Sequence, residues 1–340
     1  METIMKVAIV DHVGAPWTLE DRPVPAVGPN DVLVRVHATG ICGTDTWMAN
    51  GILEFHPFPL LLGHEGVGEI VAVGDAVTTR KVGERVGIPM VQQTCGKCEA
   101  CLKERPNSFA SAVNCTGGPR LTGVTVDGAF AEYIAADAEG TVVLPEGISY
   151  EDAAPTMCAG YTVWAGLRKA QPKPGATVGV VGIGGLGHLA IQYAKAAGYR
   201  VVAVTKSTDK YDLARRFGAD EVVADGAALK AAGGADALLH TSSSHASVVD
   251  AMSGLKPWGK VVVMGVAIDE MHLPAGPLAF QGYEVIGSAH NGNEYLVEAL
   301  DLVAQGKVKP MIEVYPKERI GEAYEAASTG RARFRSVVTF

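Results

Sequence analysis

The sequence lacks any cluster of lysine and arginine residues that could serve as a footprint for nucleic acid. Its 340 residues include 29 basic and 37 acidic side chains, which gives a net charge of −8. Phosphate backbones are bound by concentrated positive charge. The charge balance therefore argues against a nucleic-acid partner.

A secretion signal and an uninterrupted apolar segment are also missing. The chain carries an acid at Glu2 and turns at once into an alternating strand pattern, without the basic region and apolar core of a signal peptide. The one long uncharged run, residues 175–194, contains six glycines as well as His188 and Gln192. It predicts a strand, a turn and a helix, so we expect a cytoplasmic protein with no membrane segment.

Cysteine is scarce, with six residues, and without a secretion signal these indicate metal or catalytic thiols rather than disulfides. Cys42 and Cys158 can join His64 in a zinc site of two thiolates and one imidazole, which leaves a fourth position open for substrate. A second metal site is indicated by a triplet at two-residue spacing, with one further thiol available as fourth ligand: Cys95, Cys98, Cys101 and Cys115.

Two kinds of sequence pattern follow one another along the chain and predict two domains. Short alternating segments separated by proline and glycine turns, up to about residue 148, predict a compact all-β unit of barrel-like character. Buried β-branched runs then alternate with alanine-rich helical patterns, which predicts a parallel sheet covered by helices on both faces. The tail is expected to return to the first domain. We therefore assign residues 1–152 and 289–340 to the first domain and 153–288 to the second.

A glycine fingerprint, G-x-G-x-x-G, lies between a predicted strand at 178–181 and a predicted helix at 189–197. Such glycines allow a tight turn and a close approach of the backbone to a pyrophosphate at a helix N-terminus. The motif predicts a dinucleotide site with these residues: Gly182, Gly184, Gly185, Leu186 and Gly187.

The end of the next strand bears on which dinucleotide is bound. NAD sites usually carry an acid there for the ribose 2′-hydroxyl, whereas this chain has Thr205, Lys206 and Ser207. No carboxylate stands there to repel a 2′-phosphate, so we favour NADP. The alternative is NAD, with Asp209 reaching the ribose or Lys206 pointing to solvent.

Together these motifs resemble the zinc-dependent medium-chain alcohol dehydrogenases, in the bacterial and cinnamyl-alcohol-dehydrogenase-like branch. The resemblance rests on the pattern G-H-E-x-x-G-x5-G-x-x-V over residues 63–77, on segments 41–45 and 157–160, on the cysteine triplet and on the glycine fingerprint. It implies an α/β fold with a discontinuous, β-rich GroES-like catalytic domain and a doubly wound Rossmann domain, with substrate and nicotinamide meeting between them.

The resemblance also implies roles for individual residues. Cys42, His64 and Cys158 correspond to the ligands of a catalytic zinc, and the four other cysteines to those of a structural zinc. Asp45 corresponds to the partner that orients His64, and Glu65 to a carboxylate that can approach the metal. Thr44 is expected to hydrogen-bond the substrate oxygen, and Arg335 to reach the cofactor pyrophosphate.

Three departures from the family pattern stand out. Trp47 occupies the position where many relatives place a histidine of the proton relay, and indole cannot shuttle a proton. Phe109 stands at the usual spacing of the fourth structural cysteine, so we interpret the segment before Cys115 as a short insertion. Ile52, with Met90 and Val91, falls where relatives acting on small primary alcohols place aromatics, which favours a larger pocket for aromatic aldehydes or secondary alcohols.

The predicted function is hydride transfer between an alcohol and an aldehyde or ketone, by a homo-oligomer that is a tetramer or else a dimer. Two alternatives are a zinc- and dinucleotide-binding sensor without turnover and a zinc-free relative of quinone reductases; the full set Cys42, His64 and Cys158 argues against the second.

The remaining histidines show no ligand spacing and are interpreted as ordinary polar or packed residues. Residues 242–245, Ser-Ser-Ser-His, resemble a serine–histidine pair, but adjacency in sequence is not triad geometry. This segment fits a loop at the cofactor edge of the sheet. The histidines concerned are His12, His37, His56, His188, His240, His245, His272 and His290.

Overall fold

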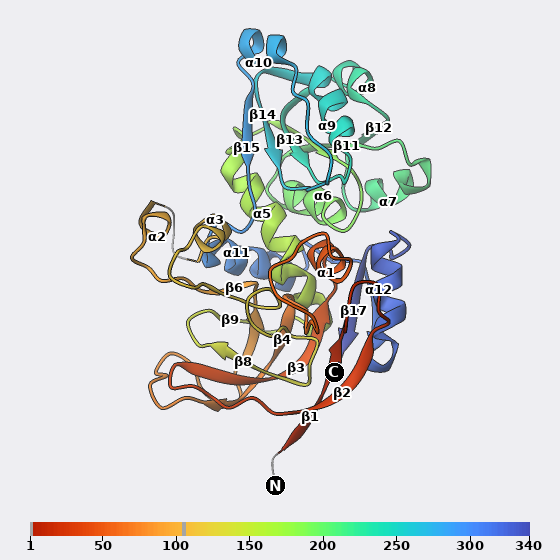
Figure 1. Ribbon diagram of the computed structural model, residues 1–340. Helices are drawn as coiled ribbons and strands as arrows, with labels where there is room; N and C mark the ends of the chain where they lie inside the picture. Colours follow the sequence, from red (N-terminus) through yellow and green to blue (C-terminus); the bar gives the residue numbers. More distant parts are fainter. Residues whose placement is uncertain (1–2, 104–106) are drawn as a thin grey trace. The chain divides into compact units, whose positions relative to one another are not determined.

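The computed structural model describes residues 3–103 and 107–340 and divides into two compact units (Figure 1). Unit 1 comprises Met1–Cys158, His290–Ala304 and Pro310–Phe340, and unit 2 comprises Ala159–Ala289 and Gln305–Lys309. The chain leaves unit 1 after Cys158 and returns to it at His290. The sequence predicted these boundaries at residues 152 and 289. No helix among the described residues is long and apolar enough to span a membrane.

Unit 1 is built on a seven-stranded sheet in which β3 is the central strand. The main path has the order β16-β17-β3-β4-β5-β9, and β8 also pairs with β3. The N-terminal half of β3 pairs with β8 and its C-terminal end with β17, while β4 lies along its other edge. The C-terminal strand therefore joins the first domain's sheet, which confirms the predicted return of the tail.

The strands of unit 1 are β1 (Ile4–Ile9), β2 (Thr18–Pro23), β3 (Asp31–Gly40), β4 (Gly66–Val73), β5 (Arg85–Ile88), β6 (Val91–Gln93), β7 (Arg120–Leu121), β8 (Tyr133–Asp137), β9 (Val142–Val143), β16 (Ile312–Pro316) and β17 (Arg335–Thr339). Its helices are α1 (Gly43–Ala49), α2 (Glu99–Lys103), α3 (Phe109–Val113), α4 (Tyr150–Ala153), α11 (Asn293–Ala304) and α12 (Ile320–Ser328), with 3₁₀ turns η1 (Ala154–Met157) and η4 (Lys317–Arg319).

The expectation of an all-β unit in the first 148 residues is wrong, because α1, α2 and α3 lie within it. Helix α1 begins at Gly43, directly after Cys42. The carboxylate of Asp45, in its first turn, accepts a hydrogen bond from the backbone N–H of Cys42 at 2.8 Å, and an acid in this position stabilises a helix start. The predicted insertion before Cys115 forms α3.

Unit 2 is a six-stranded, all-parallel sheet with the order β12-β11-β10-β13-β14-β15. The chain starts at β10, proceeds outward to β12, returns to β13 beside β10 and proceeds the other way. In such a sheet ligands bind at the carboxyl ends of the two strands where the order reverses, here β10 and β13. All five residues of β10 are buried, as the continuous apolar run at 178–181 predicted.

The strands of unit 2 are β10 (Thr177–Val181), β11 (Arg200–Val204), β12 (Glu221–Val223), β13 (Ala235–His240), β14 (Leu255–Val263) and β15 (Glu284–Gly287). The helices are α5 (Ala159–Ala170), α6 (Gly187–Ala196), α7 (Tyr211–Arg216), α8 (Gly226–Ala231), α9 (His245–Ala251) and α10 (Ala275–Gln281), with 3₁₀ turns η2 (Thr208–Lys210) and η3 (Met252–Gly254). The predicted alternation of strands and helices is thus confirmed.

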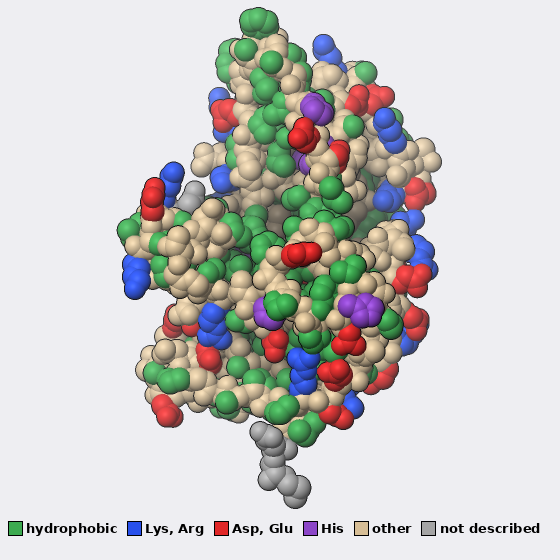
Figure 2. Space-filling model, in the orientation of Figure 1, with side chains coloured by type: hydrophobic (Ala, Val, Ile, Leu, Met, Phe, Trp, Pro, Cys, Tyr) green, Lys and Arg blue, Asp and Glu red, His purple; other side chains and the backbone are tan. Residues whose placement is uncertain are grey.

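On the face drawn in Figure 2, basic and acidic side chains are interspersed, and no block of Lys and Arg forms.

Candidate functional site

Strand ends bring one group of predicted ligands together in unit 1. Cys42 follows the end of β3, and His64 and Glu65 immediately precede β4, whose first residue pairs with Thr39. Cys158 follows η1, where the sulfur of Met157 fills the space beside Gly87 in β5. One potential ligand atom from each of Cys42, His64, Glu65 and Cys158 lies within 4.8 Å of the others, and all four residues are buried.

The carboxylate of Asp45 holds the histidine and the first cysteine in place. Its Oδ2 accepts from the backbone N–H of Cys42, and its Oδ1 accepts from the backbone N–H of Gly63 at 3.1 Å. His64 Nδ1 lies 3.2 Å from the same Oδ1. Asp45 is 1% exposed, so these contacts are shielded from water.

This contact settles which ring nitrogen of His64 is available. With Nδ1–H donating to Asp45, Nε2 is the nitrogen left for a metal ion, and it is buried with no hydrogen-bond partner among the described residues. Burial alone lowers the pKa of His64, but the neighbouring Asp45 carboxylate and Cys42 thiolate raise that pKa well above its usual value. An imidazole placed in this way is suited to a metal ion, which would replace the missing partner.

The two thiols of the site lie within hydrogen-bond distance of each other. Their sulfurs are 3.7 Å apart. A hydrogen bond from Cys158 lowers the pKa of Cys42 well below its usual value, and the same contact together with burial raises the pKa of Cys158. Thiolates bind zinc and related ions, whereas thiols do not. The donor set of two sulfurs and one imidazole nitrogen therefore fits a zinc ion, which would take both cysteines as thiolates.

Glu65 is paired with Arg335, a contact that the sequence did not predict. Arg335 opens β17 beside β3 and is 5% exposed, and its guanidinium donates to Glu65 Oε1. Burial raises the pKa of Glu65 to about 7, against the opposing effect of Arg335. Gly40 makes room for this carboxylate, because a Cβ there would stand 1.9 Å from Glu65 Oε2. The predicted contact of Arg335 with cofactor pyrophosphate stays a prediction; its Nε has no partner among the described residues.

Thr44 lies in the first turn of α1, and its hydroxyl is 4.0 Å from the sulfur of Cys42. This places the hydroxyl beside the metal-binding group, where the predicted contact with a substrate oxygen requires it. Trp47 lies one turn further along the same helix.

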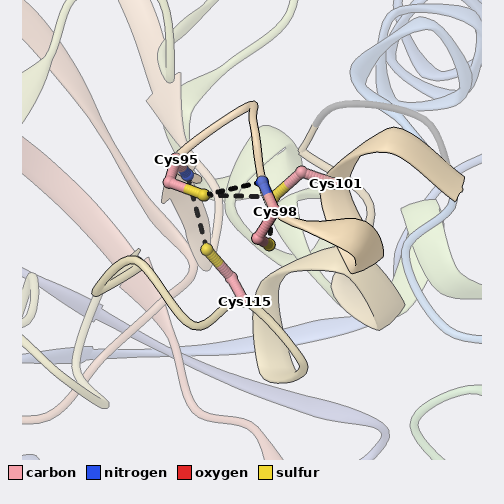
Figure 3. A group of neighbouring side chains, drawn as sticks. All are labelled: Cys95, Cys98, Cys101 and Cys115. Carbon is pink, nitrogen blue, oxygen red and sulfur yellow. Dashed lines mark hydrogen bonds between the residues drawn. The ribbon is translucent and has the colours of Figure 1, made fainter.

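The other cysteines form a second cluster (Figure 3). The four sulfurs all lie within 4.8 Å of one another; they belong to Cys95, Cys98, Cys101 and Cys115. The backbone N–H of Cys98 donates to the sulfur of Cys95 at 3.4 Å, and that of Cys95 donates to the sulfur of Cys115 at 3.4 Å. Backbone N–H groups of Cys101 and Thr116 lower the pKa of Cys98 to about 6. All four thiols are free of disulfides, and four convergent sulfurs form a closed set suited to structural zinc.

The glycine turn lies at the carboxyl end of β10, in unit 2. Gly182 has a positive φ of 89°, a conformation that favours glycine. A Cβ at Gly187 would stand 1.9 Å from the carbonyl oxygen of Gly182, whereas a Cβ at Gly184 would meet nothing within 4 Å. Gly185 and Leu186 complete the turn into α6. The turn is therefore closed by glycines on its inner side and open at Gly184, where a phosphate can approach.

The three predicted specificity residues follow β11. Thr205 is half-buried, and its hydroxyl accepts from the backbone N–H of Ser207 at 3.2 Å. Lys206 and Ser207 are exposed. No acid occupies these three positions, and Asp225, beyond the neighbouring strand β12, uses its carboxylate to cap α8.

The residues predicted to line the pocket differ in their exposure to solvent. Ile52 is 44% exposed, but Met90 and Val91 belong to the buried core of unit 1. The structure therefore does not support Met90 and Val91 as accessible lining, and the larger pocket stays a prediction.

Comparisons with known proteins agree with this geometry. Residues 28–146 match the family model for the alcohol dehydrogenase GroES-like domain, and residues 185–305 match that for zinc-binding dehydrogenases. An alcohol dehydrogenase of Geobacillus stearothermophilus is 39% identical over 341 residues, covering 98% of this chain and 99% of the relative.

Solved structures show the same fold. A cinnamyl alcohol dehydrogenase from Sorghum bicolor superimposes with a TM-score of 0.90 at 30% identity, covering 99% of this chain and 98% of the other. The CAD from Helicobacter pylori, complexed with NADP(H), gives a TM-score of 0.88 at 26% identity, covering 100% and 99% of the two chains.

Proposed function

The chain belongs to the zinc-dependent medium-chain alcohol dehydrogenases, and on this premise we propose that it transfers hydride between an alcohol and NADP(H) with the help of a zinc ion held by Cys42, His64 and Cys158. The observation that carries the proposal is the buried, unpartnered Nε2 of His64 beside two convergent sulfurs. A zinc ion bound there supplies Lewis acidity toward the oxygen of the alcohol or carbonyl substrate.

The surrounding residues have distinct tasks in this proposal. Asp45 keeps His64 in the tautomer whose Nε2 faces the site. Thr44 hydrogen-bonds the substrate oxygen and moves its proton, because its hydroxyl both donates and accepts. The Glu65–Arg335 pair keeps a buried carboxylate beside the donor set, and Arg335 balances its charge. The substrate class we favour is aromatic or secondary alcohols and the corresponding aldehydes and ketones.

The four-cysteine cluster is proposed to hold a second, structural zinc. Its four sulfurs leave no position open for substrate. We therefore expect two zinc ions per chain, one in each site.

Activity with and without metal tests the main proposal. The full-length protein should oxidise alcohols with formation of reduced nicotinamide, followed by its absorbance, and metal analysis should find two zinc ions per chain. Chelation of the catalytic zinc should abolish turnover, and adding zinc back should restore it, because the substrate oxygen loses its Lewis acid. Binding of zinc and cofactor with no turnover on any substrate of a broad alcohol and aldehyde panel would instead indicate the sensor.

Cofactor preference is proposed to be NADP because no carboxylate follows β11 at Thr205, Lys206 or Ser207. An acid at this point accepts from the 2′-hydroxyl of NAD and repels a 2′-phosphate. The alternative is an enzyme that prefers NAD, and the Helicobacter pylori relative with NADP(H) does not decide between the two for this chain.

Replacing Thr205→Asp should reverse the preference. We expect kcat/KM for NADP to fall by about tenfold or more, while kcat/KM for NAD stays level or rises. Repulsion of the 2′-phosphate should cost about as much binding free energy as one hydrogen bond to a charged group contributes. Thr205→Asn is the matched control, because it has nearly the same shape without the charge. A wild-type enzyme that already prefers NAD would contradict the argument.

Homo-oligomer formation is proposed from an exposed sheet edge in unit 2. β15 is the edge strand of the six-stranded sheet, and three of its four residues are exposed. Two large apolar side chains are also exposed: Trp258 in β14, the strand that pairs with β15, at 78%, and Phe280 in α10, just before β15, at 88%. An open strand edge with apolar neighbours invites pairing with another chain.

Light scattering after size-exclusion chromatography tests the oligomer. The wild type should elute as a tetramer or a dimer, and Val285→Lys in β15 should shift it toward smaller species, because a charge opposes edge pairing. Val82→Lys, which places the same charge at an exposed position of unit 1 outside its strands, is the control. A monomeric wild type would refute the proposal.

A further inference from the structure

Two buried histidines in unit 2 are hydrogen-bonded to each other, although no ligand spacing in the sequence pairs them. His240 is the last residue of β13 and His245 the first of α9. Their rings are hydrogen-bonded, with His240 Nε2 3.1 Å from His245 Nδ1, and the side chains are 0% and 8% exposed. One N–H donates to the other ring nitrogen, so the bond bridges the ends of the loop Thr241–Ser244.

The start of this loop is fixed on the glycine turn. The hydroxyl of Thr241 donates to the carbonyl oxygen of Gly182 at 2.7 Å, and its backbone N–H donates to that of Val181 at 3.0 Å. A Cβ at Gly182 would stand 2.7 Å from Cα of Ser242. The loop and the dinucleotide turn are therefore in direct backbone contact.

The other side of the loop packs against a third turn. A Cβ at Gly265, just after β14, would stand 2.3 Å from the carbonyl oxygen of Ser242. The loop thus contacts both the turn after β10 and the turn after β14, the two strands that flank β13 in the sheet. A shift of the loop toward either turn would displace that turn, because Ser242 already lies in close contact with Gly182 and with Gly265.

The place of the pair in the sheet connects it with the cofactor. His240 pairs with Val181, the last residue of β10, so it stands at the carboxyl ends of the two strands between which the order of the sheet reverses. The helix that follows obtains no help from its N-cap, because Ser244 makes no side-chain capping bond. The imidazole pair joins the start of α9 to the end of β13.

We propose that His240 and His245 form a clamp that positions the loop Thr241–Ser244 and, through it, the Gly182–Gly187 turn for dinucleotide binding. Both are positioning residues. The inference rests on the proposed nicotinamide cofactor but not on the choice between NADP and NAD, because the turn receives the pyrophosphate that both contain.

His240 enters this bond as a neutral ring. Burial and the neighbouring His245 lower the pKa of His240 to about 4, so His240 is uncharged near neutral pH. An uncharged ring can share one N–H with its partner, whereas two charged rings would repel each other.

Direct binding of NADPH and of NADH to the full-length protein, followed by nicotinamide fluorescence, tests the clamp. His245→Ala should raise both Kd values by about tenfold and by the same factor, the scale of one buried hydrogen bond. His245→Gln should recover most of the loss, since its amide can still bond His240. His240→Ala combined with His245→Ala should be little worse than either alone, because both remove the same contact.

His272→Ala, which removes an exposed imidazole from the same unit, is the control and should bind both cofactors as the wild type does. If His240→Ala fails to fold, the comparison of His245→Ala with His245→Gln still decides the matter. Wild-type Kd values in a folded His245→Ala protein, or equal losses in the Ala and Gln variants, would overturn the clamp. Failure of the wild type to bind either cofactor would overturn the proposed function instead.

Discussion

The buried carboxylate of Asp45 is the constraint on which the metal-binding group in unit 1 depends. Its two oxygens accept hydrogen bonds from the backbone of Cys42 and of Gly63 and contact the ring of His64. It thereby joins the segment after β3 to the segment before β4 and sets the tautomer of the histidine. With fewer hydrogen-bond donors, burial of this carboxylate would cost more free energy than its contacts contribute. The helix start, the turn at Gly63 and the imidazole therefore stabilise one another.

The two units use different chemical groups to order the loops around their sites. In unit 1 the buried carboxylate of Asp45 orders two chain segments around a metal-binding set, and Arg335 pairs with the second carboxylate, Glu65. In unit 2 the loops at the carboxyl edge of the sheet are ordered by glycines, by Thr241 and by a neutral histidine pair. Dinucleotide phosphates are received by backbone N–H groups and a helix N-terminus, so here the position of the backbone matters more than side-chain charge.

The sequence predicted most of the fold because its signals are local. Buried runs such as 178–181 specify strands, and the glycine fingerprint specifies a turn that only glycine can form at Gly182 and Gly187. The spacing of cysteines placed Cys115 with the triplet, and the structure brings its sulfur there. Contacts outside the recognised motifs were not predicted. Arg335 and Glu65 are 270 positions apart, and the His240–His245 bond depends on how a loop closes at the edge of the sheet.

The most direct measurement is the zinc affinity of the catalytic site in Asp45→Asn, by competition with a chromophoric chelator. The amide can reproduce only one carboxylate oxygen, so its NH₂ group would face a donor N–H, and the site should bind zinc about 10- to 100-fold more weakly. Asp75→Asn, at an exposed position, should bind zinc as the wild type does. Wild-type affinity in a folded Asp45→Asn protein would contradict the account.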